Sequence, residues 1–191
     1  MLLTHHGLIP EIGTESVVKE KDKPKLRQIV QTLGDLSYLD PELLIKTGLA
    51  HRELGDSVEA VRYYRASLQI EESERAFFHL GYDLHELGRY KEAIERWEKA
   101  NEIRPEDANT LMNWGNALRN LGRYEEAIQK YQQADKIRPE DANTLVNWGI
   151  ALQMLKRFKE AKKMYQRAAT IARATGDTVR AEKYEKLTRE L

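Results

Sequence analysis

Asparagine side chains recur along one stretch of the sequence at the spacing of a helix face. The four residues lie at intervals of four, three and four: Asn109, Asn113, Asn116 and Asn120. Residues three or four apart lie on the same side of an α-helix, so the carboxamides would form one stripe. A carboxamide carries two N–H donors and an acceptor oxygen, so it can pair with peptide N–H and C=O groups whatever the peptide's side chains. The stripe predicts a peptide-binding surface.

Part of this stripe is repeated 34 residues later, where the sequence holds Asn143 and Asn147. Asparagine has an indifferent helix propensity, so helix stability does not explain its choice. In the alternative interpretation, Asn113 and Asn147 cap or bridge neighbouring helices, whereas Asn109 and Asn143 are ordinary first-turn residues. The sequence leaves both interpretations open.

Large apolar and cationic side chains accompany the asparagines. Phe78, Tyr82 and Met112 are expected on the same side and could anchor an apolar part of a ligand. Packing between helices is the alternative role for these three. The candidate partners for acidic groups of a ligand are Arg52, Arg75 and Arg119. A surface of this kind would prefer an extended or helical segment with an apolar anchor.

The residues that usually carry catalysis or bind metals do not form a recognisable site. His79 and His85 are six residues apart in one expected helix, whereas metal-binding pairs on helices are three or four apart. His51 is expected to be a partly buried structural residue, because Leu84, Leu118 and Leu152 occupy its equivalent positions. The sequence contains no cysteine, which excludes disulfides, thiolate nucleophiles and zinc–thiolate sites. We therefore expect no enzymatic activity, no cofactor and no metal site.

The balance of charges restricts the class of partner. Lys and Arg together number 31, as do Asp and Glu. Nucleic-acid binding relies on a clustered excess of cations, so this balance argues against it. No apolar stretch approaches the roughly 20 residues that span a bilayer, and the N-terminus lacks the features of a secretory signal. These features favour a cytoplasmic protein that does not insert into a membrane.

An internal repeat determines the expected fold. The sequence IRPEDANTL begins at Ile103 and again at Ile137, 34 residues later. Three further sets of residues recur in the same register: Gly48, Gly81, Gly115 and Gly149; Ala60, Ala93, Ala127 and Ala161; and Tyr64, Trp97, Tyr131 and Tyr165.

This pattern resembles the tetratricopeptide repeat (TPR) family, whose signature combines an apolar–Gly pair, an Ala, an aromatic residue and a terminal Pro. The resemblance covers roughly residues 41–173 as four repeats. It departs from the signature at Glu72 and Arg173, which replace the terminal Pro, and at Lys156, which replaces a turn glycine. The resemblance implies an all-α fold, a right-handed α-α superhelix (TPR solenoid) of four full repeats with a flanking N-terminal helix and a C-terminal capping helix.

Apolar stripes at helical spacing predict the helices themselves. Gly115 and Ala127 are small and would let two helices approach closely beside Tyr131. Gly122 fits a position of positive φ, and Asp107 and Asp141 fit helix N-caps. The expected helices cover residues 41–54, 57–70, 74–87, 90–103, 108–121, 124–137, 142–155, 158–174 and 178–190.

The expected organisation has a flexible arm (1–23), an N-terminal helix (24–40), four repeats (41–73, 74–107, 108–141 and 142–175) and a C-terminal cap (176–191). A polar cap is needed because a terminal repeat otherwise exposes its apolar face. Val179, Ala181, Tyr184 and Leu187 are expected to cover the fourth repeat. In an alternative interpretation of the arm, Leu8–Pro10 or Val17–Val18 docks in a groove of this chain or of a neighbour.

Two binding modes known from TPR proteins can be compared with this sequence. In the asparagine ladder, which grips an extended backbone, Asn113 and Asn147 match two rungs, whereas Lys46 and His79 occupy earlier ones. The carboxylate clamp for chaperone tails is disfavoured, because Met112 stands where that clamp needs a Lys. The resemblance therefore implies an adaptor that binds a peptide or protein segment in a concave groove. The alternatives are a self-associating scaffold, with possible homo-oligomers, and a regulatory subunit of a larger complex.

Overall fold

The computed structural model describes residues 40–191 and, before them, Pro24, Arg27, Gln28 and Gln31. These four earlier residues have helical backbone. The flexible arm expected over residues 1–23 and its alternative docking segments lie outside the described residues. So does most of the helix expected over residues 24–40.

Between residues 40 and 191 all regular secondary structure is α-helical, as the repeat predicts. The helices are α2 (Pro41–Glu53), α3 (Ser57–Ile70), α4 (Glu74–Glu86), α5 (Tyr90–Ile103), α6 (Ala108–Asn120), α7 (Tyr124–Ile137), α8 (Ala142–Met154), α9 (Phe158–Ala174) and α10 (Thr178–Arg189). Each begins at the residue expected from the sequence and ends within one residue of the expected end. The helix predictions are therefore confirmed.

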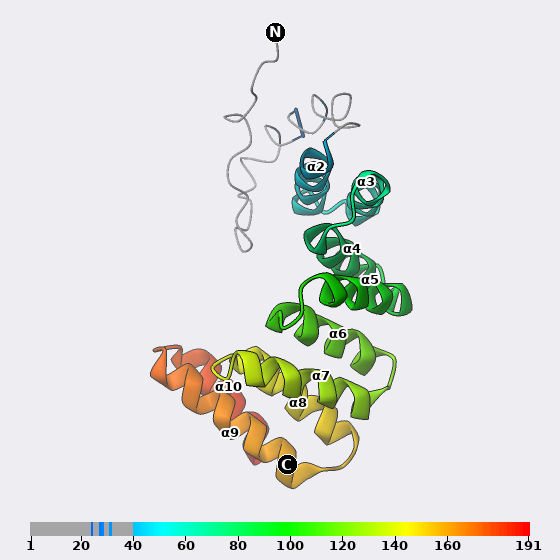
Figure 1. Ribbon diagram of the computed structural model, residues 1–191. Coiled ribbons are helices and arrows are strands. Elements are labelled where there is room, and N and C mark those ends of the chain that lie inside the picture. Colours follow the sequence, from blue (N-terminus) through cyan, green and yellow to red (C-terminus); the bar gives the residue numbers. More distant parts are fainter. Residues whose placement is uncertain (1–23, 25–26, 29–30, 32–39) are drawn as a thin grey trace. The chain divides into compact units, whose positions relative to one another are not determined.

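The chain divides into two compact units, Met1–Leu87 (unit 1) and Gly88–Leu191 (unit 2). In unit 1, α2 packs on α3 and α3 packs on α4 (Figure 1). In unit 2, each helix from α5 to α10 packs on the next along the chain (Figure 1). The boundary falls inside the repeat expected over residues 74–107, between its two helices.

Two different devices begin the helices of a repeat. Asp107 and Asp141 accept backbone N–H groups of Thr110 and Thr144 at 2.7 and 3.2 Å, as expected of N-caps. In the second, third and fourth repeats, the second helix begins instead at an ion pair between an arginine and a glutamate three residues later. In α7, for example, Nε and Nη2 of Arg123 donate to the two carboxylate oxygens of Glu126 at 2.7 and 2.6 Å. The same pair recurs at Arg89–Glu92 and Arg157–Glu160.

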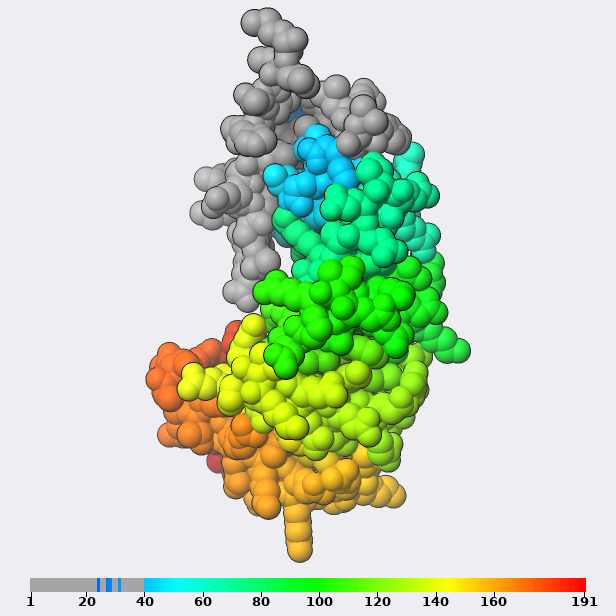
Figure 2. Space-filling model, in the orientation of Figure 1, coloured from blue at the N-terminus to red at the C-terminus, as the bar shows by residue number. Residues whose placement is uncertain are grey.

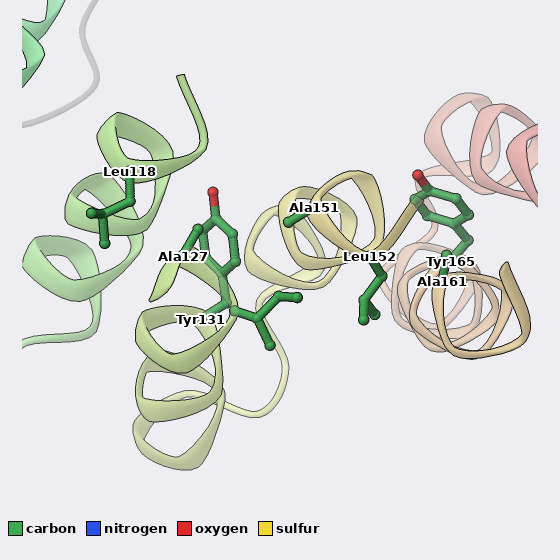
Figure 3. Close-up of a cluster of buried hydrophobic side chains, with 8 residues drawn as sticks. Leu118, Ala127, Tyr131, Ala151, Leu152, Ala161 and Tyr165 are labelled. Carbon is green, nitrogen blue, oxygen red and sulfur yellow. The ribbon is translucent and has the colours of Figure 1, made fainter. Parts of the chain in front are cut away.

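Small residues and tyrosines form the contact between the two helices of a repeat. A Cβ placed on Gly115 would lie 2.6 Å from Cε1 of Tyr131, which is fully buried. Only glycine therefore lets α6 approach α7 around this ring, and Gly149 has the same relation to Tyr165. Figure 3 shows how the buried side chains follow one another from helix to helix: Leu118; Ala127 and Tyr131; Ala151 and Leu152; Ala161 and Tyr165.

The turns inside the repeats require a left-handed backbone. Gly122 has φ +75°, in agreement with the prediction for that position. In the fourth repeat the equivalent residue is Lys156, which adopts φ +60° despite its side chain. The repeat geometry is thus kept at this turn even where the residue is not glycine.

Helix α10 covers the fourth repeat, but one expected contact is wrong. Ala181 and Tyr184 are buried against Ala168 and Ala172 of α9, and Leu187 is partly buried there. Val179 is 77% exposed instead of covering the repeat. It lies two residues before Ala181, which turns its side chain roughly 200° away from the buried stripe.

Candidate functional site

The predicted asparagine stripe lies on two neighbouring helices of unit 2. We call this surface the α6–α8 face and define it by Met112, Asn113, Asn116 and Arg119 of α6 and Asn147 of α8. All five side chains are partly buried. The Gly–Tyr contacts that set the spacing of α6, α7, α8 and α9 also set the positions of these side chains.

A hydrogen bond joins the two helices of this face. Nη1 of Arg119 donates to Oδ1 of Asn147 at 3.1 Å. This contact matches the alternative interpretation, in which Asn147 bridges neighbouring helices. Only the oxygen of Asn147 is used, so its two N–H donors are not engaged by this bond. The guanidinium group expected to meet an acidic ligand therefore already has a partner within the protein.

Asn116 also has a partner within its own repeat. The buried hydroxyl of Tyr131 donates to Oδ1 of Asn116 at 2.9 Å. Burial raises the pKa of this tyrosine, so the hydroxyl stays protonated and remains a donor. The equivalent hydroxyl of Tyr165 donates to Oε1 of Gln153 at 3.0 Å. Asn116 thus satisfies the hydroxyl of Tyr131 with its side-chain oxygen, and only the N–H groups of the Asn116 amide are left for a ligand.

Asn113 differs from its neighbours on the stripe. Its carboxamide is partly buried and makes no hydrogen bond with any other residue that the structure describes. Asn143 is exposed, whereas Oδ1 of Asn109 accepts a hydrogen bond from Arg138 at 3.0 Å. Asn113 is therefore the asparagine of this face whose donors and acceptor are all available to a ligand.

The apolar member of the face, Met112, is not freely exposed. It is half-buried and packs against two apolar clusters, one around Leu118 and one around Leu111. Packing between helices, the alternative role expected for Met112, therefore accounts for part of its surface. Only the remaining part can contact a ligand.

In unit 1 the corresponding positions carry a different set of groups. Nη1 of Arg52 lies 3.3 Å from Nδ1 of His79, and its guanidinium stands 5.1 Å from the centre of the Tyr82 ring. Phe78 makes an edge-on contact with the ring of His79 at 5.3 Å. Tyr82 is 37% exposed, whereas Phe78 is half-buried. Both predicted aromatic residues therefore border the Arg52–His79 pair.

Behind this pair lies a buried carboxylate that the sequence reasoning missed. Asp83 has no exposed surface, and neither of its oxygens has a hydrogen bond of ordinary geometry. Its nearest cation is Arg52, with 3.9 Å between Nη1 and Oδ2. Burial raises the pKa of Asp83 to about 6, although the Ser57 hydroxyl, Arg52 and the Tyr64 hydroxyl oppose the rise.

The signal for Asp83 was present in the repeat register. The equivalent positions, two residues after each repeat glycine, hold Ala50, Ala117 and Ala151, and all three are buried. A carboxylate in a set of buried alanines predicts a departure from the common packing. Burial also lowers the pKa of His79 to about 3, so this histidine is neutral beside Arg52.

The other histidine and arginine singled out from the sequence, His51 and Arg75, both lie in unit 1. His51 is partly buried and stacks on Tyr63 at 5.0 Å, as expected of a structural residue. Arg75 pairs with Glu42, so this arginine also has an acidic partner inside the protein.

Within the described part of the chain, no three His, Cys, Asp or Glu side chains gather closely enough to hold a metal ion. The helices described are also all too short or too polar to cross a bilayer.

Comparison with known proteins agrees with the repeat geometry. A family model described as tetratricopeptide repeat matches residues 106–174, and a second, described as TPR repeat, matches residues 81–118. No curated protein matches the chain in a sequence comparison.

Among solved structures, a crystal structure of MamA superimposes with a TM-score of 0.77 and 18% identity, covering 86% of this chain and 99% of the chain in that structure. MamA 41-end from Desulfovibrio magneticus RS-1 gives a TM-score of 0.72 and 22% identity, covering 80% and 96%. At these identities the likeness establishes the fold alone. Residues 106–174 and 81–118 match tetratricopeptide repeat models and the Gly–Tyr contact recurs from repeat to repeat, so the chain belongs to the tetratricopeptide repeat family.

Proposed function

We propose that the protein is a non-catalytic adaptor whose α6–α8 face binds an extended segment of another protein. The TPR fold supports a protein-interaction role in general, because stacked repeats present long surfaces that bind other chains. The chemistry of the face supports recognition of a polypeptide backbone in particular. We also retain the cytoplasmic location expected from the sequence as part of the proposal.

The observation that carries the proposal is the unpaired carboxamide of Asn113. Asn109, Asn116 and Asn147 each accept a hydrogen bond from a neighbouring side chain. Asn113 bonds no other side chain in the described part of the chain, and its carboxamide is not fully buried, so a ligand can reach it. An extended peptide offers alternating N–H and C=O groups, which suit a group that both donates and accepts.

The neighbouring groups define the rest of the recognition. The Arg119–Asn147 bond fixes the orientation of the Asn147 amide, so its free N–H groups point in a set direction. The free part of Met112 offers an apolar contact beside Asn113. A peptide bound here would pair its backbone with Asn113 and Asn147 and place an apolar side chain on Met112.

Removing the carboxamides tests this arrangement. A peptide should first be selected on the full chain from a random-peptide display library, and its affinity then measured by isothermal titration calorimetry. Each hydrogen bond contributes about 0.5–1.5 kcal/mol, so Asn113→Ala should weaken binding by about 2–10-fold. Asn113→Ala combined with Asn147→Ala should weaken it further without lowering the melting temperature appreciably.

Asn109→Ala is the matched control. Asn109 lies on the same helix as Asn113, but it is in the first turn of α6, where its side-chain oxygen accepts a hydrogen bond from Arg138. This variant should bind the selected peptide as the unmodified protein does. A double variant at Asn113 and Asn147 that binds with full affinity would refute the proposed site. A double variant that unfolds would show that the two asparagines are structural.

Self-association and a regulatory role in a larger complex remain hypotheses, and no contact described above favours either of them. Static light scattering over a range of concentrations separates the first from the adaptor role. A persistent monomer would exclude self-association, whereas a mass that rises with concentration would support it.

A further inference from the structure

A cluster of lysines and two exposed apolar side chains surround the turn between α8 and α9. We call it the basic turn patch and define it by Met154, Lys156, Phe158, Lys159, Lys162 and Lys163. The four lysines are exposed, Met154 is 56% exposed and Phe158 is 45% exposed. Figure 2 shows the segment around this turn, coloured light orange, with side chains projecting from the surface.

The charge of this patch is only partly neutralised locally. None of its four lysines forms an ion pair with a residue in the described part of the chain. Glu160, the one acid between residues 154 and 164, accepts hydrogen bonds from Nε and Nη2 of Arg157 at 2.7 Å. These bonds and, to a smaller degree, the charge of Lys163 lower the pKa of Glu160. The chain as a whole carries equal numbers of acidic and basic residues, so the patch is a local excess of positive charge.

The patch is particular to the fourth repeat. The residues equivalent to its lysines in the third repeat are Gly122, Glu125, Ile128 and Gln129. Ile128 is buried against the following repeat, whereas Lys162 at the same position is exposed. Lys162 and Lys163 follow Lys159 by three and four residues, so the three side chains share one side of α9.

Lys156 occupies a position that disfavours lysine. It adopts φ +60°, where the repeats before it have Gly55, Gly88 and Gly122. Side chains other than glycine are strained in this conformation. The repeat geometry alone therefore favours glycine over lysine at this turn.

We propose that the basic turn patch binds the surface of an anionic lipid bilayer. Lysine is a compact, strongly hydrated point charge that responds to a diffuse negative field, whereas arginine is suited to fixed pairing with single carboxylates. The only arginine inside the segment is already paired. Four lysines beside two exposed apolar side chains match the chemistry of headgroups over an apolar layer. Phe158 and Met154 would lie at the interface without spanning the bilayer.

Vesicle co-sedimentation of the full chain tests this proposal. The protein should pellet with vesicles of phosphatidylcholine mixed with phosphatidylserine, and not with phosphatidylcholine alone. Added salt should reduce the binding, because exposed charges are screened. Lys162→Glu with Lys163→Glu should weaken it by about tenfold or more, since each lysine near an anionic surface contributes measurably. Phe158→Ala should weaken it less.

The matched control is Lys91→Glu with Lys136→Glu. Both are exposed lysines of unit 2 outside the patch, and Lys91 is equivalent in the repeat to Lys159. This control should keep its vesicle binding. Asn113→Ala should keep it as well, because the α6–α8 face is a separate site.

Lys156→Gly gives a readout that a purely structural role would not produce. Relief of the strained turn should raise the melting temperature, while loss of the charge should lower vesicle binding. The proposal would be overturned if the protein did not bind anionic vesicles. It would also be overturned if the patch variant (Lys162→Glu with Lys163→Glu) and the control variant (Lys91→Glu with Lys136→Glu) bound the vesicles equally well. Capture of soluble polyglutamate without capture of vesicles would also overturn it, in favour of an acidic protein partner.

Discussion

Unit 1 and unit 2 use the same repeat scaffold but differ in polarity at one interior position. Two residues after the repeat glycine, unit 2 places Ala117 and Ala151 in its apolar core, both with no exposed surface. Unit 1 places the buried carboxylate of Asp83 at this position in α4. The two units share the lengths of these helices and the Gly–Tyr contact: Gly48 meets Tyr64 in unit 1 as Gly149 meets Tyr165 in unit 2.

The contrast between Asp83 and the alanines of unit 2 shows that the repeat determines the spacing of the helices but not the polarity of the side chains between them. The Arg bridge between first helices is common to both units, as Arg52–His79 in one and Arg119–Asn147 in the other. Only in unit 1 does the arginine also lie near a buried acid, 3.9 Å away. A buried charge with incomplete hydrogen bonding costs stability. We therefore expect unit 1 to contain the more pH-sensitive interior.

Moving the carboxylate into unit 2 should have the largest effect. Ala151→Asp places an acid at the position equivalent to Asp83, with Arg119 and Tyr131 equivalent to Arg52 and Tyr64. The cluster shown in Figure 3 is apolar except for its tyrosine hydroxyls, and those of Tyr131 and Tyr165 already donate to Asn116 and Gln153, so we expect a loss of about 3–5 kcal/mol in urea unfolding at neutral pH. Met154→Asp, an exposed change on the same helix, should cost little. A loss below about 1 kcal/mol for Ala151→Asp would remove the distinction between the two interiors.

Removing the carboxylate from unit 1 should have a smaller effect of opposite sign. Asp83→Ala restores the residue that the other three repeats have at this position, and it eliminates two unsatisfied oxygens. We expect the free energy of unfolding at pH 7 to rise by about 1–3 kcal/mol. Arg52 keeps its contact with His79 and part of its exposure to water, which limits the cost of losing the acid. A decrease in stability would show that Asp83 and Arg52 form a net stabilising pair.

The pH dependence of stability separates the two titrating groups of unit 1. The folded pKa of Asp83, about 6, lies above its unfolded value, so Asp83 favours folding at low pH and loses that contribution as pH rises through 6. The folded pKa of His79, about 3, lies below its unfolded value, so His79 favours folding above pH 6.5 and loses that contribution as pH falls. Between pH 7 and pH 5 the two effects oppose each other.

Single variants should reveal each slope. Asp83→Ala should lose on the order of 2 kcal/mol of unfolding free energy from pH 7 to pH 5, because His79 then acts alone. His79→Asn should gain on the order of 1 kcal/mol over the same range, and it introduces the residue that Asn147 provides in unit 2. Urea titrations at each pH measure both slopes. Equal slopes in the two variants would contradict these assignments.

The helices and their packing were predictable because they depend on local spacing. Repeat glycines, capping aspartates and apolar stripes fix the helix bounds within one residue, and the positive φ of Gly122 follows from its place after a helix. The burial of Tyr131 against Gly115 follows from the same register. Such features require no knowledge of side-chain rotamers.

Side-chain partners on the candidate face were less predictable. The stripe of asparagines follows from helix periodicity, but the sequence does not reveal which carboxamide Arg119 or Tyr131 bonds. Those pairings depend on the rotation of each helix and on side-chain conformation. The exposure of Val179 differs from these pairings, because its place two residues before Ala181 puts it on the other side of the helix by periodicity alone.

The most direct test of the adaptor account is the NMR spectrum of the asparagine side chains. Titration of the isotope-labelled protein with the selected peptide should shift the side-chain amide signals of Asn113 and Asn147. The signal of Asn109, which is held by Arg138, should stay in place. Saturating peptide that leaves the Asn113 signal unmoved would contradict the proposal that the α6–α8 face binds a polypeptide backbone.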